Sequence, residues 1–169
     1  LIFVAGHGIK DEQNNYYFLP YDGDKDELSS TAVAWSDFER WIEAISAQKT
    51  ILFADTSHAG DILKSGRNIE DTQFMIERLV KAVGTVAITS SRGNEVSEEG
   101  DEWQGGVFTY AIIEALKGKA DMDEDKAVSV SELQSYVTRR VIELTNGRQH
   151  PYILSPRGYD DFPIIKVKK

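Results

Sequence analysis

The chain alternates short apolar runs with longer segments in which apolar residues recur at helical spacing. The short runs are rich in β-branched and aromatic residues, which favours strands at 1–5, 16–19, 50–54, 85–89 and 162–167. The helical spacing predicts amphipathic helices at 36–45, 74–83, 108–116 and 133–144. Strands separated by helices form βαβ units, so we expect an α/β sandwich with a mainly parallel central sheet flanked by helices.

Small and polar residues mark the expected ends of these helices. Ser36 suits the N-cap of the first helix, and Ser129 or Ser131 would cap the last one. Gly84 suits the C-terminal end of the second helix, because glycine accepts the left-handed backbone found there. The apolar face of the first helix should consist of Phe38, Trp41, Ile42 and Ile45. A polar, acidic loop is predicted from 90 to 106.

Length and composition suit one domain. The 169 residues are 41% hydrophobic, enough for one substantial core, so residues 1–169 are interpreted as a single domain. The chain opens directly inside an apolar strand, Leu1 to Ala5, without a polar lead-in. We therefore expect a domain truncated at its N-terminus, with its first strands missing and with an upstream segment or regulatory domain as an additional part of the protein.

Charge and hydropathy exclude two classes of partner. The net charge of −9 argues against nucleic-acid binding, because that affinity comes largely from cations that neutralise phosphates. No apolar run approaches the ~20 residues needed to span a membrane, and no signal peptide is visible, so a cytoplasmic location is expected. The chain has no cysteine, which excludes disulfides and thiolate metal sites.

Chemically reactive residues follow two of the predicted strands. One strand ends in Ala5-Gly6-His7-Gly8, and another is followed by Asp55-Thr56-Ser57-His58-Ala59-Gly60. Taken singly, each motif fits an ordinary turn or a helix N-cap. Together they place a histidine and a small nucleophile at neighbouring strand ends, which is where ligands bind in open α/β sheets. This combination is typical of base-assisted acyl transfer.

The sequence resembles the caspase/metacaspase-like cysteine peptidases. The resemblance rests on two segments, VAGHG and LFADTSHAG. In that family the part of the second segment that begins at Asp55 normally has the sequence Asp-x-Cys-x-x-Gly. His7 lies 57 − 7 = 50 positions before Ser57, and about 50 is the separation of base and nucleophile in caspases. The likeness extends through YYFLPYDGD, WSDFERWI, AITSSRGNEVSEE, GGVFTYAIIEALKGKAD, SVSELQSYV and RQHPYI.

The resemblance implies a role for each residue of the site. His7 would act as general base and acid, Ser57 stands at the nucleophile position, and the backbone N–H groups of Gly8 and Ser57 would form the oxyanion hole. Asp55 matches the carboxylate with which metacaspase-like relatives bind a basic P1 side chain. The expected substrate is therefore a protein or peptide with arginine or lysine at P1.

Two further positions complete the expected substrate site. Ala5 stands where metacaspases often have serine, so this part of the P1 pocket should differ from theirs. The acidic loop from Glu95 to Asp101 should border the cleft and bind basic side chains, with Glu98 as the substrate-binding residue.

Serine at position 57 changes what the chain can do. A hydroxyl has essentially no anionic form near neutral pH, whereas a thiol has a few per cent thiolate, so we expect the chain to be inactive or nearly so. An inactivating substitution and a natural pseudopeptidase that binds a peptide or protein without cutting it both account for the serine. The intact remainder of the site favours the first. A serine hydrolase using Ser57, His7 and Asp55 is a weaker third interpretation.

The expected reaction needs no cofactor and no metal, but calcium is considered as an activator. Acidic and hydroxyl residues fall at positions 1, 3, 5, 9 and 12 of an EF-hand loop, namely Asp121, Asp123, Asp125, Ser129 and Glu132. Position 6, where EF-hands carry glycine, is Lys126. Another acidic group, Asp22, Asp24 and Asp26, could contribute to calcium binding.

Overall fold

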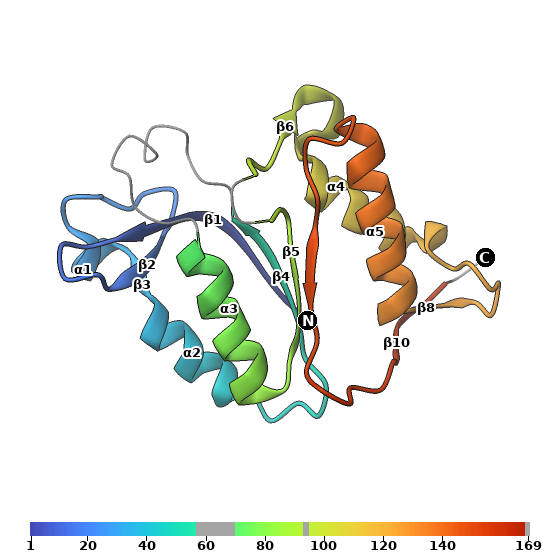
Figure 1. Ribbon diagram of the computed structural model, residues 1–169, viewed down its shortest axis with the longest axis horizontal. Helices are drawn as coiled ribbons and strands as arrows, with labels where there is room; N and C mark the ends of the chain where they lie inside the picture. Colours follow the sequence, from blue (N-terminus) through green and yellow to red (C-terminus); the bar gives the residue numbers. More distant parts are fainter. Residues whose placement is uncertain (57–69, 93–94, 168–169) are drawn as a thin grey trace.

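A six-stranded mixed sheet forms the centre of the computed structural model, which describes residues 1–56, 70–92 and 95–167 (Figure 1). The strand order is β3-β2-β1-β4-β5-β9. Three neighbouring strands, β1, β4 and β5, run parallel, and the outer pairings are antiparallel. The bounds are Ile2–Lys10 for β1, Tyr16–Leu19 for β2, Val33–Ala34 for β3, Ile51–Thr56 for β4, Val86–Thr89 for β5 and Tyr152–Leu154 for β9.

Helices cover both faces of this sheet and create two separate cores. Alternate residues of β4 face opposite sides, as strand geometry requires: Phe53 packs in the core beneath α4 and α5, whereas Leu52 packs beneath α2 and α3. The helices span Trp35–Glu43 (α2), Glu70–Val83 (α3), Val107–Glu114 (α4) and Val130–Leu144 (α5). The predicted α/β sandwich is thus confirmed, with the parallel strands at the middle of the sheet.

Several small elements were not predicted from the sequence. The acidic loop contains a short hairpin of β6 (Glu99–Gly100) and β7 (Gly105–Gly106) around the 3-10 turn η2 (Asp101–Trp103). The predicted terminal strand exists as β10 (Pro163–Lys166), but it pairs with β8 (Ala127–Ser129) in a separate two-stranded sheet. Helix α1 (Leu28–Thr31) and the π-helical turn η3 (Ala115–Lys119) complete the described elements.

The beginning of helix α2 follows packing rather than a polar signal. Helix α2 begins at Trp35, with Ala34 as N-cap and no side-chain cap, so the prediction of Ser36 as N-cap is wrong. The Trp35 ring is buried against Phe38, with ring centroids 5.5 Å apart, and this contact holds the first turn. Trp41, predicted on the apolar face, is 57% exposed.

The caps of the other two helices were predicted correctly. Ser129 Oγ accepts a hydrogen bond from the backbone N–H of Glu132, and the Glu132 carboxylate accepts one from the N–H of Ser129, which forms a capping box. Gly84 follows α3 with φ of +69°, the left-handed conformation expected at that position. Within the described ranges, no helix is long and apolar enough to cross a membrane.

Glu114 connects helices α4 and α5. It is 6% exposed on α4 and accepts hydrogen bonds from Lys119, from Arg140 Nε at 2.9 Å and from the Tyr136 hydroxyl at 3.3 Å. Burial by itself raises the pKa of Glu114, but the hydrogen bonds from Lys119 and Arg140 outweigh it and lower the pKa to about 2. Glu114 therefore stays ionised and holds α4 against α5.

We predict that Glu114→Gln lowers the free energy of unfolding at pH 7 by about 1–3 kcal/mol, because Arg140 loses the carboxylate that balances its charge. The folded-state pKa of Glu114, about 2, lies below its ordinary value of 4.5, so its stabilisation is complete above pH 4.5 and is lost as the pH falls towards 2. Urea denaturation at pH 7 and pH 3 should show a smaller difference between variant and parent at pH 3. A constant difference would contradict this account.

Candidate active site

The parallel pairing of β1 with β4 brings the two reactive segments together, although β1 continues past His7 to Lys10 and does not end at Ala5 as predicted. In this register Ala5 lies opposite Asp55 and Gly6 lies opposite Thr56. His7 is the next residue on β1, while Ser57 directly follows β4 and lies outside the described residues. Among the residues predicted for the site, the structure therefore places His7, Ala5 and Asp55 in one region.

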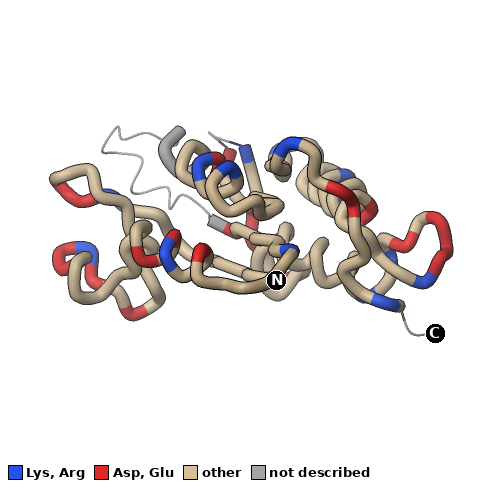
Figure 2. Tube along the Cα trace, turned by 90° about the horizontal axis from the view of Figure 1, so that it is seen from below, with Lys and Arg blue, Asp and Glu red and all other residues tan. Residues whose placement is uncertain are grey.

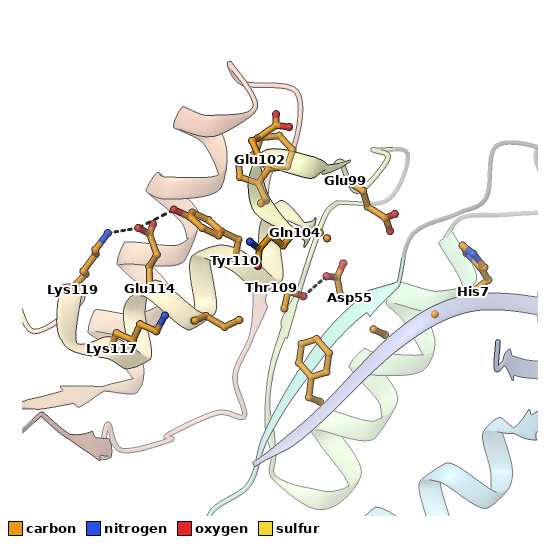
Figure 3. A pocket seen from close by; sticks show the side chains of 17 residues that line it. His7, Asp55, Glu99, Glu102, Gln104, Thr109, Tyr110, Glu114, Lys117 and Lys119 are labelled. Atoms are coloured by element: carbon orange, nitrogen blue, oxygen red, sulfur yellow. Dashed lines mark hydrogen bonds and ion pairs between the residues drawn. The ribbon is translucent and has the colours of Figure 1, made fainter.

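A hollow of about 790 Å³ opens at this edge of the sheet, between the strand ends and helix α4 (Figure 3). Its walls come from four parts of the chain: β1, the end of β4, the β6–β7 hairpin and α4 with the turn that follows it. His7, Asp55 and Glu99 surround one end, whereas Lys117 and Lys119 lie at the other. The hollow is thus acidic beside the histidine and basic far from it.

Asp55 is the chemically unusual group of this hollow. Its Oδ2 accepts a hydrogen bond from Thr109 Oγ1 at 2.6 Å, and the Ser90 hydroxyl also donates to the carboxylate. Burial raises the pKa of Asp55, these two hydrogen bonds lower it, and the nearby charge of Glu99 raises it again; the net shift is upward. In the described part of the chain, no lysine, arginine or histidine forms an ion pair with Asp55. The described groups that hydrogen-bond to this carboxylate are therefore neutral hydroxyls.

Two glycines permit the close packing around these groups. A Cβ on Gly106 would lie 2.8 Å from Asp55 Oδ2, so only glycine lets α4 begin this close to the carboxylate. A Cβ on Gly8 would overlap with the Tyr16 hydroxyl, which lies over the backbone next to His7. Both glycines are required by neighbouring atoms, and the oxyanion role of Gly8 remains a prediction.

The acidic loop borders the hollow, but Glu98 does not line it. The Glu98 carboxylate accepts two hydrogen bonds from Arg148, at 2.5 Å from Nε and 2.8 Å from Nη2. Glu99 and Glu102 line the hollow instead. Glu99 faces the hollow and Glu98 does not, because adjacent residues of an extended segment point in opposite directions. The substrate-binding role of Glu98 remains a prediction.

Sequence reasoning missed Thr109, Ser90 and Gly106 as parts of the site. Thr109 lies on α4 and is 54 residues from Asp55, and Ser90 follows β5. The only signal was positional, since Ser90 follows a parallel strand and Gly106 precedes a helix, both at the edge where ligands bind.

The acidic turn before α5 lies at the end of the elongated molecule that also holds the C-terminus (Figures 1 and 2). Asp121, Asp123 and Glu132 each offer a carboxylate oxygen, and these oxygens lie within 4.8 Å of one another. Lys126 has φ of +71°, the left-handed backbone of the EF-hand glycine position, and its N–H donates to Asp121 Oδ2 at 3.2 Å. In the described ranges no such group includes Asp22, Asp24 or Asp26.

Comparisons with known proteins agree on one fold. The family model for the caspase domain matches residues 1–163. The crystal structure of protein GSU0716 from Geobacter sulfurreducens superposes with a TM-score of 0.56 at 17% sequence identity, over 94% of this chain and 66% of that protein. This chain thus spans about two thirds of the length of that protein, and the likeness concerns the fold alone. Among curated proteins, none matches the sequence.

We predict that Thr109→Val raises the pKa of Asp55 further, because the hydrogen bond from Thr109 favours the ionised carboxylate and valine cannot donate one. Valine has nearly the same shape, so the fold should be kept. Carboxyl-carbon NMR titration of Asp55 in both proteins measures the change. An unchanged or lower pKa in the variant would show that the Thr109 bond does not stabilise the charged form.

Proposed function

The chain belongs to the caspase domain family, and on that premise we propose that it is the peptidase domain of a cysteine-type endopeptidase that cleaves after arginine or lysine. The observation that carries the specificity is Asp55, a carboxylate at the strand end beside His7 with no cationic partner among the described residues. A metacaspase-like cleavage after basic residues follows, because a guanidinium or ammonium group of the substrate would supply the missing charge.

The proposed reaction requires cysteine at position 57. His7 would take the thiol proton, and the thiolate would attack the carbonyl carbon of the scissile peptide bond. The oxyanion that forms would accept hydrogen bonds from the backbone N–H groups of Gly8 and residue 57. His7 would then protonate the leaving amine, and water activated by the same histidine would hydrolyse the acyl-enzyme.

The P1 pocket of this proposal consists of Asp55, Ala5 and the residues of α4 that face them. Ala5 has no hydroxyl, so hydrogen bonds to the Asp55 carboxylate come from Thr109 and Ser90 on the other wall. Because burial raises the pKa of Asp55, a bound cation would favour its ionised form and bring the pKa down again. Binding of a basic side chain and ionisation of Asp55 are therefore coupled.

Serine at position 57 makes this chain a binder rather than a catalyst in our proposal. The Ser57 hydroxyl has essentially no anionic form, and a site shaped for the larger sulfur atom does not make the oxygen an effective nucleophile. A natural pseudopeptidase would use the same hollow to bind a basic peptide without cleavage. A serine hydrolase with Asp55 as the orienting carboxylate is disfavoured, because the described hydrogen bonds to Asp55 come from Thr109 and Ser90.

Two features from the sequence remain parts of the proposal. An upstream segment or a regulatory domain is proposed as a partner of this domain. A cytoplasmic location remains a prediction.

Calcium binding at the turn before α5 is a separate proposal. The observation that favours it is Asp121 Oδ1, which is buried without a hydrogen-bond partner among the described residues and belongs to a carboxylate grouped with those of Asp123 and Glu132. Carboxylate oxygens are the ligands that calcium prefers. The peptidase reaction itself uses no step through this ion.

We predict that Ser57→Cys converts the chain into a peptidase that cleaves fluorogenic peptides after arginine and lysine but not after aspartate. His7→Ala in the same background should abolish turnover, because no base remains. Asp55→Asn should lower kcat/KM for basic peptides by about 10²-fold or more, because a charged hydrogen-bonded pair is lost. Circular dichroism verifies folding, and a folded cysteine variant that cleaves none of these peptides would favour the pseudopeptidase.

We predict that isothermal titration of calcium into the chain gives heat for one site, and that Asp121→Asn removes most of it. Asp22→Asn is the matched control, because it deletes the same charge from the other acidic group and should leave the titration unchanged. Absence of heat in the parent chain contradicts the calcium proposal and leaves the peptidase proposal untouched.

A further inference from the structure

Three glutamates of the loop that borders the hollow differ in whether a basic side chain contacts them. Glu95 is held by His150, whose Nδ1 lies 2.7 Å from Oε1 and whose backbone N–H donates to Oε2 at 2.6 Å. Glu98 is held by the two hydrogen bonds from Arg148. Glu99 has no such hydrogen bond or ion pair within the described part of the chain, and it faces the hollow.

The residues that hold Glu95 and Glu98 belong to one tripeptide, Arg148-Gln149-His150, which we call the clamp. Gln149, at its centre, is fully buried. Its Oε1 accepts from the backbone N–H of Glu98 at 2.7 Å, and its Nε2 donates to the carbonyl oxygen of Ser90 at 2.8 Å. Since Ser90 also donates its hydroxyl to Asp55, the clamp fixes the backbone next to Glu99 to the residue that contacts Asp55.

The hairpin register places Glu99 next to Gly106, and both residues line the hollow. Glu99 pairs with Gly106 in the β6–β7 ladder, and Gly106 is the residue whose missing side chain leaves room for the Asp55 carboxylate. Figure 3 shows Glu99, Asp55 and His7 around the same end of the hollow, with Lys117 and Lys119 at the other end. Lys119 is already paired with Glu114. The negative charge beside His7 is therefore not balanced by the cations that line the hollow.

We propose that Glu99 is the second carboxylate of the P1 pocket, that it makes the pocket select arginine over lysine, and that the clamp positions it. A guanidinium is a planar fork with five N–H donors and can bond carboxylates on two sides at once. An ammonium is a compact, strongly hydrated charge that one carboxylate satisfies nearly as well as two. This inference rests on the proposed function, since it names the substrate preference of the same site.

Binding to the chain with Ser57 in place tests the inference without requiring turnover. The probes are three fluorescent peptides that end in arginine amide, lysine amide or citrulline amide, measured by fluorescence anisotropy. Citrulline has the shape of arginine without its charge. We expect arginine to bind about tenfold more tightly than lysine and at least that much more tightly than citrulline, which corresponds to about one charge-assisted hydrogen bond.

The decisive variant is Glu99→Gln. It should lower the affinity for the arginine peptide by about tenfold and the affinity for the lysine peptide by less than about threefold, so that the two affinities become similar. Asp101→Asn is the matched control, because it removes one negative charge from the same hairpin without lining the hollow, and it should change both affinities by less than about twofold. An equal loss for both peptides would overturn the role of Glu99 in selectivity.

Failure of the inference and failure of the proposed function give different results. If Asp55→Asn abolishes arginine-peptide binding while Glu99→Gln leaves the arginine-to-lysine ratio unchanged, only the role of Glu99 is overturned. If the parent chain binds the arginine and citrulline peptides equally, the basic P1 pocket itself is wrong.

Arg148→Gln tests the positioning role of the clamp. The Arg148 side chain is 60% exposed, so its replacement opens no cavity in the core. We expect the variant to lower the arginine-to-lysine affinity ratio when Glu99 is present and to leave the ratio unchanged in the Glu99→Gln background. If the arginine-to-lysine affinity ratio falls by the same factor in both backgrounds, Arg148 has a general structural role. The proposal that the clamp positions Glu99 would then be wrong.

Discussion

The parallel pairing of β1 with β4 is the constraint on which the rest of the site depends. Its register sets Ala5 opposite Asp55 and Gly6 opposite Thr56, so that His7 and the carboxyl end of β4 are brought to one edge of the parallel part of the sheet. Both strands lie in the middle of the sheet, with Phe53 and Leu52 of β4 buried in different cores. A register shift of one residue would move every side chain of β4 to the opposite face of the sheet. The packing of both cores therefore stabilises the register on which the site depends.

Two carboxylates in contact with α4, those of Glu114 and Asp55, differ in the groups that bind them. Glu114 is buried but surrounded by Lys119, Arg140 and Tyr136, and its pKa falls to about 2. Asp55 bonds to the same helix through Thr109; among the described residues only neutral hydroxyls donate to it, and its pKa rises. The first arrangement stabilises the fold by itself. The second is the reason why we propose recognition for Asp55 and structure for Glu114.

The sequence predicts the closeness of His7 and Asp55 well and the opposite wall poorly, and it ends the first strand too early, because β1 continues past His7 to Lys10. The apolar runs mark β1 and β4, and strand-end logic then places His7 near Asp55. Residues contributed by α4 and the hairpin could not be assigned, because their positions depend on contacts between segments more than fifty residues apart, such as Thr109 with Asp55. The choice between Glu98 and Glu99 depends on which way a two-residue strand faces, and charge pattern alone does not contain that information. Helix α2 similarly begins where Trp35 finds its aromatic neighbours rather than at the polar signal of Ser36.

The central claim is that an unneutralised carboxylate beside His7 selects a basic residue for cleavage. The most direct measurement is mass-spectrometric identification of every bond that the Ser57→Cys chain cuts in an unbiased peptide library. Our account predicts arginine and lysine immediately before the cut bonds, with neighbouring positions varied. Cuts that follow aspartate or apolar residues, or that show no preference at this position, would contradict it.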